Sequence, residues 1–156
     1  MAEIENSKDL ISVLWSGADI LRSKMDANEY KDYLLGIVFY KYLSDSYLAK
    51  AYDLLNDETP DNLQEAQKQY EEVMKNEDAN DLIQELRETM HYTLDPDMTY
   101  VSILNDAKSN AFNREKLQAA FNRIQESDEL FNGLFADVDL YSNRLGTGDL
   151  KQSATI

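Results

Sequence analysis

The stretch from residue 20 to residue 45, ILRSKMDANEYKDYLLGIVFYKYLSD, decides the fold of this chain. It opens with polar residues that are typical of a helix start. Asp26 followed by Glu29 has the spacing of a capping box, in which each side chain satisfies a backbone amide at the beginning of a helix. We therefore expect a helix to begin near Ala27.

The same stretch continues with an apolar run from Tyr33 to Tyr40 that almost lacks polar residues. At about 100° per residue these side chains point in all directions around a helix axis, whereas later charged residues gather on one side. Gly36 costs about 1 kcal/mol of helix propensity, and close approach of a neighbouring helix is the usual compensation. The sequence predicts a long central helix over about residues 27–55. Its front half should be central and covered by protein, and its back half should have one solvent-exposed face.

The composition favours helices throughout the chain. Only five Gly and two Pro occur in 156 residues, and Leu, Ala, Glu, Lys and Gln are abundant. We predict an all-α fold, a compact multi-helix bundle with at most a very short extended segment near residues 92–94. The turn signal Asp95-Pro96 separates that segment from a short helix that follows.

Further helix starts follow from capping residues. The expected caps are Asn6 or Ser7, Thr59 with Pro60 at the first helical position, Asp78 or Asn80, Thr99, Asn113 and Ser127. After Ser127 the inward side chains should include Leu130, Leu134, Phe131 and Phe135. The tyrosines at helical positions, such as Tyr40 and Tyr47, are expected at the edge of the core with the ring buried and the hydroxyl in water.

Charge and cysteine content exclude several classes of protein. Thirty acids face fifteen bases, and residues 57–90 alone hold eleven acids and three bases, so most of the surface should repel a polyanion. The absence of Cys excludes disulfides, thiolate metal sites and cysteine nucleophiles, and it suits the reducing cytoplasm. The acidic start lacks the pattern of a secretory signal, and the apolar run is too short for a bilayer. We expect a cytoplasmic protein without a membrane segment.

Candidate catalytic groups are few, and each has a simpler structural interpretation. His91 is the only histidine and has no second His or Cys with which to hold a metal. Asp137 and Asp139 have a spacing that an exposed strand or loop also gives. The glycines of Gly146-Thr147-Gly148 lack the following helix that a phosphate-binding loop requires. The sequence therefore predicts no catalytic, cofactor-binding or metal site in these residues.

Four cations are the candidates for contact with DNA or with an acidic partner surface. They lie in the least acidic third of the chain and are Arg22, Lys24, Lys31 and Lys41. An ordinary solvated face is the alternative interpretation.

The order of residues along the chain resembles a known family. LWSGADILRSKMDANEYKDYLLGIVFYKYLSD (14–45), HYTLDPDMTY (91–100) and SDELFNGLFADVDLYSNRLG (127–146) are similar to segments of the modification (M) subunits of type I restriction-modification systems. The resemblance extends over nearly the whole chain and is far more specific than any single short motif above. It implies the N-terminal helical domain of such a subunit, at residues 1–145, with residues 146–156 as a tail or the start of a linker to a catalytic domain.

The resemblance also implies an activity that this chain does not carry alone. The family's subunits transfer a methyl group from S-adenosylmethionine to the N6 of adenine in DNA, using a cofactor loop and a catalytic motif that are absent from these 156 residues. We expect no enzymatic activity and no cofactor for this fragment. The implied partners are a specificity (S) subunit, a second M subunit, a restriction (R) subunit and double-stranded DNA, which the domain would help to clamp while the target base is flipped out.

Two other classes of function stay open from sequence alone. An acidic helical protein can imitate DNA and inhibit DNA-binding enzymes, although Lys68, Lys75 and Arg87 interrupt the only dense acidic stretch. A stand-alone helical adaptor is the third possibility.

Overall fold

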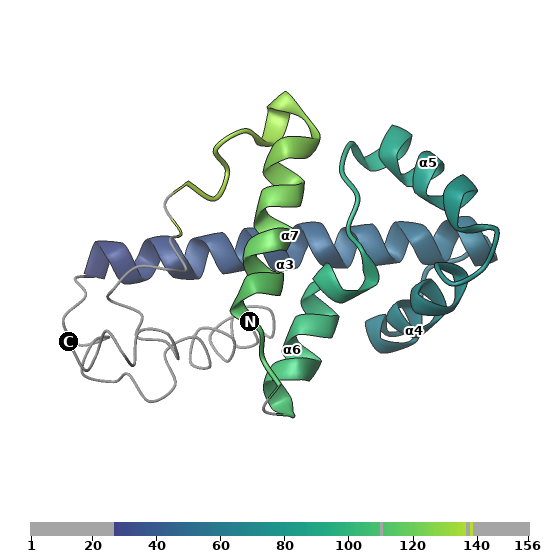
Figure 1. Cartoon of the computed structure of the whole chain (residues 1–156), viewed down its shortest axis with the longest axis horizontal. Coiled ribbons are helices and arrows are strands. Elements are labelled where there is room, and N and C mark those ends of the chain that lie inside the picture. Colours follow the sequence, from purple (N-terminus) through teal and green to yellow (C-terminus); the bar gives the residue numbers. More distant parts are fainter. Residues whose placement is uncertain (1–26, 110, 137, 139–156) are drawn as a thin grey trace. The chain divides into compact units, whose positions relative to one another are not determined.

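The computed structural model describes residues 27–109, 111–136 and 138, and all of the regular structure there is helical. The α-helices are α3 (Ala27–Asn56), α4 (Leu63–Val73), α5 (Ala79–Met90), α6 (Tyr100–Lys108) and α7 (Arg114–Ser127), and the 3-10 helices are η1 (Pro96–Met98) and η2 (Glu129–Phe131) (Figure 1). The all-α prediction is confirmed, and so is the long helix, which begins at Ala27 as expected. No strand occurs in the described residues, including residues 92–94.

The chain divides into two compact units. One comprises Met1–Phe39 with Leu134–Ile156, and the other comprises Tyr40–Gly133. Helix α3 supplies its first part to one unit and its remainder to the other. The predicted boundary between residues 145 and 146 and the first predicted cap, Asn6 or Ser7, lie outside the described residues.

In the first unit, the side chain of Val138 packs closely against α3 at Gly36. A Cβ atom placed on Gly36 would lie 2.3 Å from Cγ2 of Val138, so only a glycine allows this approach. The predicted close packing is confirmed, although Val138 belongs to an irregular segment and not to a helix. The described residues cover this part of the helix only partly, because the side chains of Leu35 and Phe39 are 50% and 43% exposed.

In the second unit, α4, α6 and α7 pack against the back half of α3 (Figure 1). The rings of Tyr100 in α6 and Phe121 in α7 both lie edge-on to Tyr40, with centroids 5.9 and 5.4 Å away. Tyr47 meets Tyr70 of α4 in the same edge-on manner at 5.5 Å. This aromatic cluster forms the centre of the buried core, which is an arrangement that aromatic pairs favour.

The helix caps agree with the sequence in part. Thr99 and Asn113 cap α6 and α7, and each accepts hydrogen bonds from backbone amides in the first turn. Asp78 precedes α5, but its side chain makes no capping bond. Helix α4 begins after Asn62 and not at Pro60, because the Asn62 side chain accepts the amide of Glu65. The predicted cap at Thr59 is therefore wrong.

The segment after α7 also differs from the prediction. Ser127 ends α7, and Asp128 caps the short η2 in its place by accepting the amide of Leu130 at 3.0 Å. Leu130 is 76% exposed, whereas Phe135 is buried as predicted. Three residues of 3-10 helix are too few to present the regular inward face that the periodicity suggested.

Candidate functional site

The four predicted contact residues have different surroundings. Arg22 and Lys24 lie outside the described residues, and Lys31 is exposed on α3. Lys41 is only 9% exposed; its ammonium group bonds to Asp45 and lies 5.4 Å from the centre of the Tyr100 ring. The structure therefore engages Lys41 within its own unit and not on the wet face that the sequence predicted. A contact of these residues with DNA or a partner stays a prediction.

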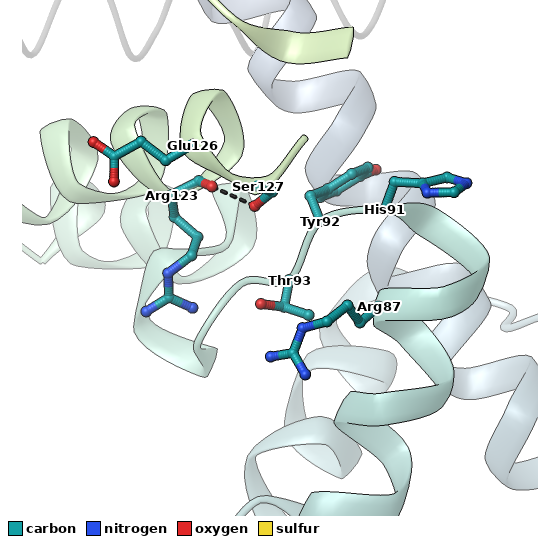
Figure 2. Close-up of a pocket in the computed structure, with 7 residues that line it drawn as sticks. All are labelled: Arg87, His91, Tyr92, Thr93, Arg123, Glu126 and Ser127. Atoms are coloured by element: carbon teal, nitrogen blue, oxygen red, sulfur yellow. Dashed lines mark hydrogen bonds between the residues drawn. The ribbon is translucent and has the colours of Figure 1, made fainter. Parts of the chain in front are cut away.

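A pocket of about 460 Å³ lies in the second unit, between the ends of α5 and α7 (Figure 2). Its lining residues come from the last turn of α5, from the connection that follows it and from the end of α7: Arg87, His91, Tyr92, Thr93, Arg123, Glu126 and Ser127. Figure 2 shows the guanidinium group of Arg123 to the left of Thr93 and that of Arg87 below it, while the Glu126 carboxylate points away from Thr93. Basic groups from two helices therefore line the same pocket.

His91 lies at the end of α5, where the chain leaves the helix, and lines this pocket. It is the C-cap of α5 and has a left-handed backbone conformation, with φ at 71°, and its amide donates to the carbonyl of Arg87 at 3.0 Å. Such a conformation costs a non-glycine residue about 1–2 kcal/mol, so the surrounding packing must hold it. The imidazole Nδ1 lies 3.5 Å from a carboxylate oxygen of Asp128. His91 thus has a structural role at the end of α5.

Side chains of the core fix the backbone between His91 and α6. The Tyr70 hydroxyl donates to the Leu94 carbonyl at 2.5 Å, and the Gln67 amide donates to the Pro96 carbonyl at 2.8 Å. The Tyr40 hydroxyl donates to the Met98 carbonyl at 2.5 Å. The carbonyls of three alternate residues, Leu94, Pro96 and Met98, therefore have buried partners on α3 or α4. We call residues 92–99 the anchored segment.

The tyrosine hydroxyls that make these bonds are buried and not in water. Tyr40, Tyr47 and Tyr70 are completely buried, and the hydroxyls of Tyr47 and Tyr70 lie 2.7 Å apart. The Tyr92 hydroxyl donates to the carbonyl of Leu43 at 2.7 Å. The expectation of hydroxyls in water is wrong for Tyr40 and Tyr47, because the Met98 carbonyl and the Tyr70 hydroxyl are their partners inside the core.

Burial sets the protonation of these phenols. Desolvation raises the pKa of Tyr40, Tyr47, Tyr70 and Tyr92 above the ordinary value of 10.0. For Tyr47, the hydrogen bond with Tyr70 acts in the opposite direction and lowers the pKa, but it is the smaller effect. Near neutral pH these groups are therefore neutral hydrogen-bond donors, and Tyr92 among them lines the pocket.

The two arginines of the pocket are engaged to different extents. Arg123 forms a forked ion pair with Asp95, whose two oxygens lie 3.2 and 3.3 Å from its two terminal nitrogens. Both partners are partly exposed, so the pair contributes at most about 1 kcal/mol to stability. Arg87 forms no ion pair in the part of the chain that the structure describes. Its place in the last turn of α5 is also favourable for the helix dipole.

These groups can bind an anion, and their chemistry is that of recognition. Guanidinium groups donate in a planar fork that fits carboxylates and phosphates, and the Thr93 hydroxyl adds a donor to the pocket lining. Among residues 27–109, 111–136 and 138, no group of three or more His, Asp or Glu residues is arranged to hold a metal ion. Asp95-Pro96 forms the entry to η1, which confirms the predicted turn.

The sequence did not single out this pocket. Arg87 and Arg123 belong to different helices, and the only sign of either was that Arg87 interrupts the acidic stretch.

Asp137, Asp139 and the Gly146-Thr147-Gly148 segment lie outside the described residues. In the helices that the structure describes, no segment combines the length and apolar character of a membrane span.

Comparisons with known proteins give a consistent result. Residues 10–156 match the HsdM N-terminal domain family. The crystal structure of a type I restriction-modification system methyltransferase subunit from Streptococcus thermophilus superposes with a TM-score of 0.75 at 42% sequence identity. The match covers 96% of this chain and 32% of that subunit, so the chain spans about a third of its length.

Proposed function

The chain belongs to the HsdM N-terminal domain family, which confirms the resemblance in its sequence, and we propose that it acts in subunit assembly and in clamping of DNA. The match over residues 10–156 is the observation that carries this proposal. In this proposal the complete subunit is an adenine-N6 methyltransferase that uses S-adenosylmethionine in its catalytic part. The present chain contributes contacts and no methyl-transfer chemistry.

Exposed apolar side chains support a role in protein contact. Leu35 and Phe39 are exposed in the first unit, and Tyr42, Leu54 and Leu130 are exposed in the second. Apolar surface of this kind suits contact with the catalytic part of the subunit, with a second M subunit, or with the S and R subunits. A cytoplasmic location, where the DNA and these partners would be, belongs to the same proposal.

The acid content of the chain supports closure of the clamp by protein contacts. A net charge of −15 opposes the counterion release from which DNA affinity mainly comes. The proposed clamp therefore closes through contacts between subunits, while basic surfaces elsewhere in the assembly hold the phosphates. The DNA-mimic and stand-alone adaptor functions lack a comparable observation in their favour.

Deletion of the domain from the complete subunit tests the proposal. We expect a subunit without residues 1–145 to bind S-adenosylmethionine normally but to lose affinity for duplex DNA in complex with the S subunit. Calorimetry would measure cofactor binding, and gel-filtration light scattering would measure assembly. Normal assembly and DNA affinity after the deletion would refute the role, and so would S-adenosylmethionine binding by the 156-residue chain alone.

A further inference from the structure

We propose that the pocket between α5 and α7 binds a carboxylate on an acidic segment of a partner protein. Arg87 is exposed and has no ion pair within the described residues, and the Asp95 fork uses only two of the five N–H donors of Arg123. Thr93 borders the same pocket, with the Arg123 guanidinium on its left and the Arg87 guanidinium below it in Figure 2. A carboxylate placed there receives a fork from Arg87, a further donor from Arg123 and a hydroxyl.

Charge around the pocket favours a single carboxylate over a nucleic-acid backbone. Asp95 and Asp128 pair with Arg123 and His91, and Glu126 is also part of the lining. A duplex carries one negative charge per about 1.7 Å of its length, so it would bring many phosphates within a Debye length of these acids. An acidic side chain on a protein brings one charge, which the Arg87 guanidinium balances.

Apolar groups beside the pocket favour a peptide in which the acid has an apolar neighbour. The ring of Phe131 in η2 stands edge-on to Tyr92 of the pocket lining, with centroids 5.4 Å apart. Next to Phe131 in the sequence, Leu130 is the most exposed of the large apolar side chains that the structure describes. A volume of about 460 Å³ accommodates one or two side chains and not a duplex.

The proposed site can be tested on the 156-residue chain itself, so its outcome does not depend on the assembly role proposed above. The probe is a short acetylated and amidated peptide with one glutamate between leucines. The control is the same peptide with glutamine in place of glutamate. Two-dimensional NMR of the arginine Nε–Hε signals reports binding at Arg87 and Arg123 directly. A short DNA duplex is titrated in parallel.

We expect the glutamate peptide to shift both arginine signals in a saturable way, with a dissociation constant of about 1 mM, and the glutamine peptide to leave them in place. Arg87→Gln should weaken binding about tenfold, because it removes charge-assisted hydrogen bonds. Arg87→Lys should restore part of the loss, since it returns the charge without the fork. Lys108→Gln, which removes an exposed cation outside the pocket, should change nothing.

Three results would overturn the proposal. The glutamine peptide could shift the same signals as strongly, which would make the contact apolar. Arg87→Gln could bind the glutamate peptide as tightly as the parent chain. The duplex could saturate the arginine signals at lower concentration than the peptide, which would make the pocket a nucleic-acid site.

Discussion

Replacement of Gly36 by alanine tests the closest contact in the structure. The added Cβ would lie 2.3 Å from Cγ2 of Val138, well inside the 3.4 Å at which ordinary van der Waals contact begins. Alanine gains about 1 kcal/mol of helix propensity over glycine. Overpacking costs about 1–3 kcal/mol, and so short a contact belongs at the upper end. We expect Gly36→Ala to lower the free energy of unfolding by about 2 kcal/mol.

A double-mutant cycle with Val138→Ala identifies the cause. The single change Val138→Ala removes two methyl groups from a buried side chain and should cost about 2 kcal/mol. In the double mutant the overlapping methyl of residue 138 is gone, so the alanine at position 36 adds only its favourable helix propensity. The free energy of unfolding should then fall by about 1 kcal/mol in total. Independent effects of the two changes would instead add to about 4 kcal/mol. Urea unfolding followed by circular dichroism measures all four proteins. Additivity within about 0.5 kcal/mol would refute the reasoning.

Three further predictions concern the buried tyrosines and a helix cap. Tyr70→Phe should lower the free energy of unfolding by about 1–3 kcal/mol, and by more than Tyr47→Phe does. It leaves both the Leu94 carbonyl and the Tyr47 hydroxyl without a partner. Equal losses in urea unfolding would contradict this. Asn113→Ala should cost about 1 kcal/mol, since the side chain caps α7, and a thermal melt without a lowered midpoint would speak against it. Burial raises the pKa of Tyr70 and Tyr92 above 10.0, so as the pH rises the unfolded chain loses these protons before the folded chain does. The free energy of unfolding should therefore not depend on these two groups below about pH 10 and should fall above it. Urea midpoints that stay constant to about pH 11 would exclude this.

The helices were predictable from sequence where local chemistry determines them. The start of α3 at Ala27 followed from the spacing of the residues before it, and the caps at Thr99 and Asn113 followed from side chains that reach amides in the next turn. The start of α4 was misplaced, because Pro60 and Asn62 are both acceptable start signals and only the geometry selects the asparagine. Local rules thus determined the existence of helices better than their ends.

The pocket and the buried hydroxyls could not be predicted, because they depend on contacts between distant residues. No local sequence pattern shows that the Tyr40 hydroxyl bonds to the Met98 carbonyl, or that Arg87 and Arg123 line the same pocket. The exposure of Leu35 and Phe39 could not be assigned to these residues for the same reason, since periodicity does not show how much of a helix its neighbours cover.

The anchored segment has an evolutionary consequence. Tyr92 and Thr99 bond to the core through their side chains, but the three bonds at Leu94, Pro96 and Met98 run through carbonyls, and a main-chain carbonyl is the same whichever amino acid carries it. Solvent-facing side chains such as that of Asp97 can therefore be exchanged among relatives while the path of the backbone is retained.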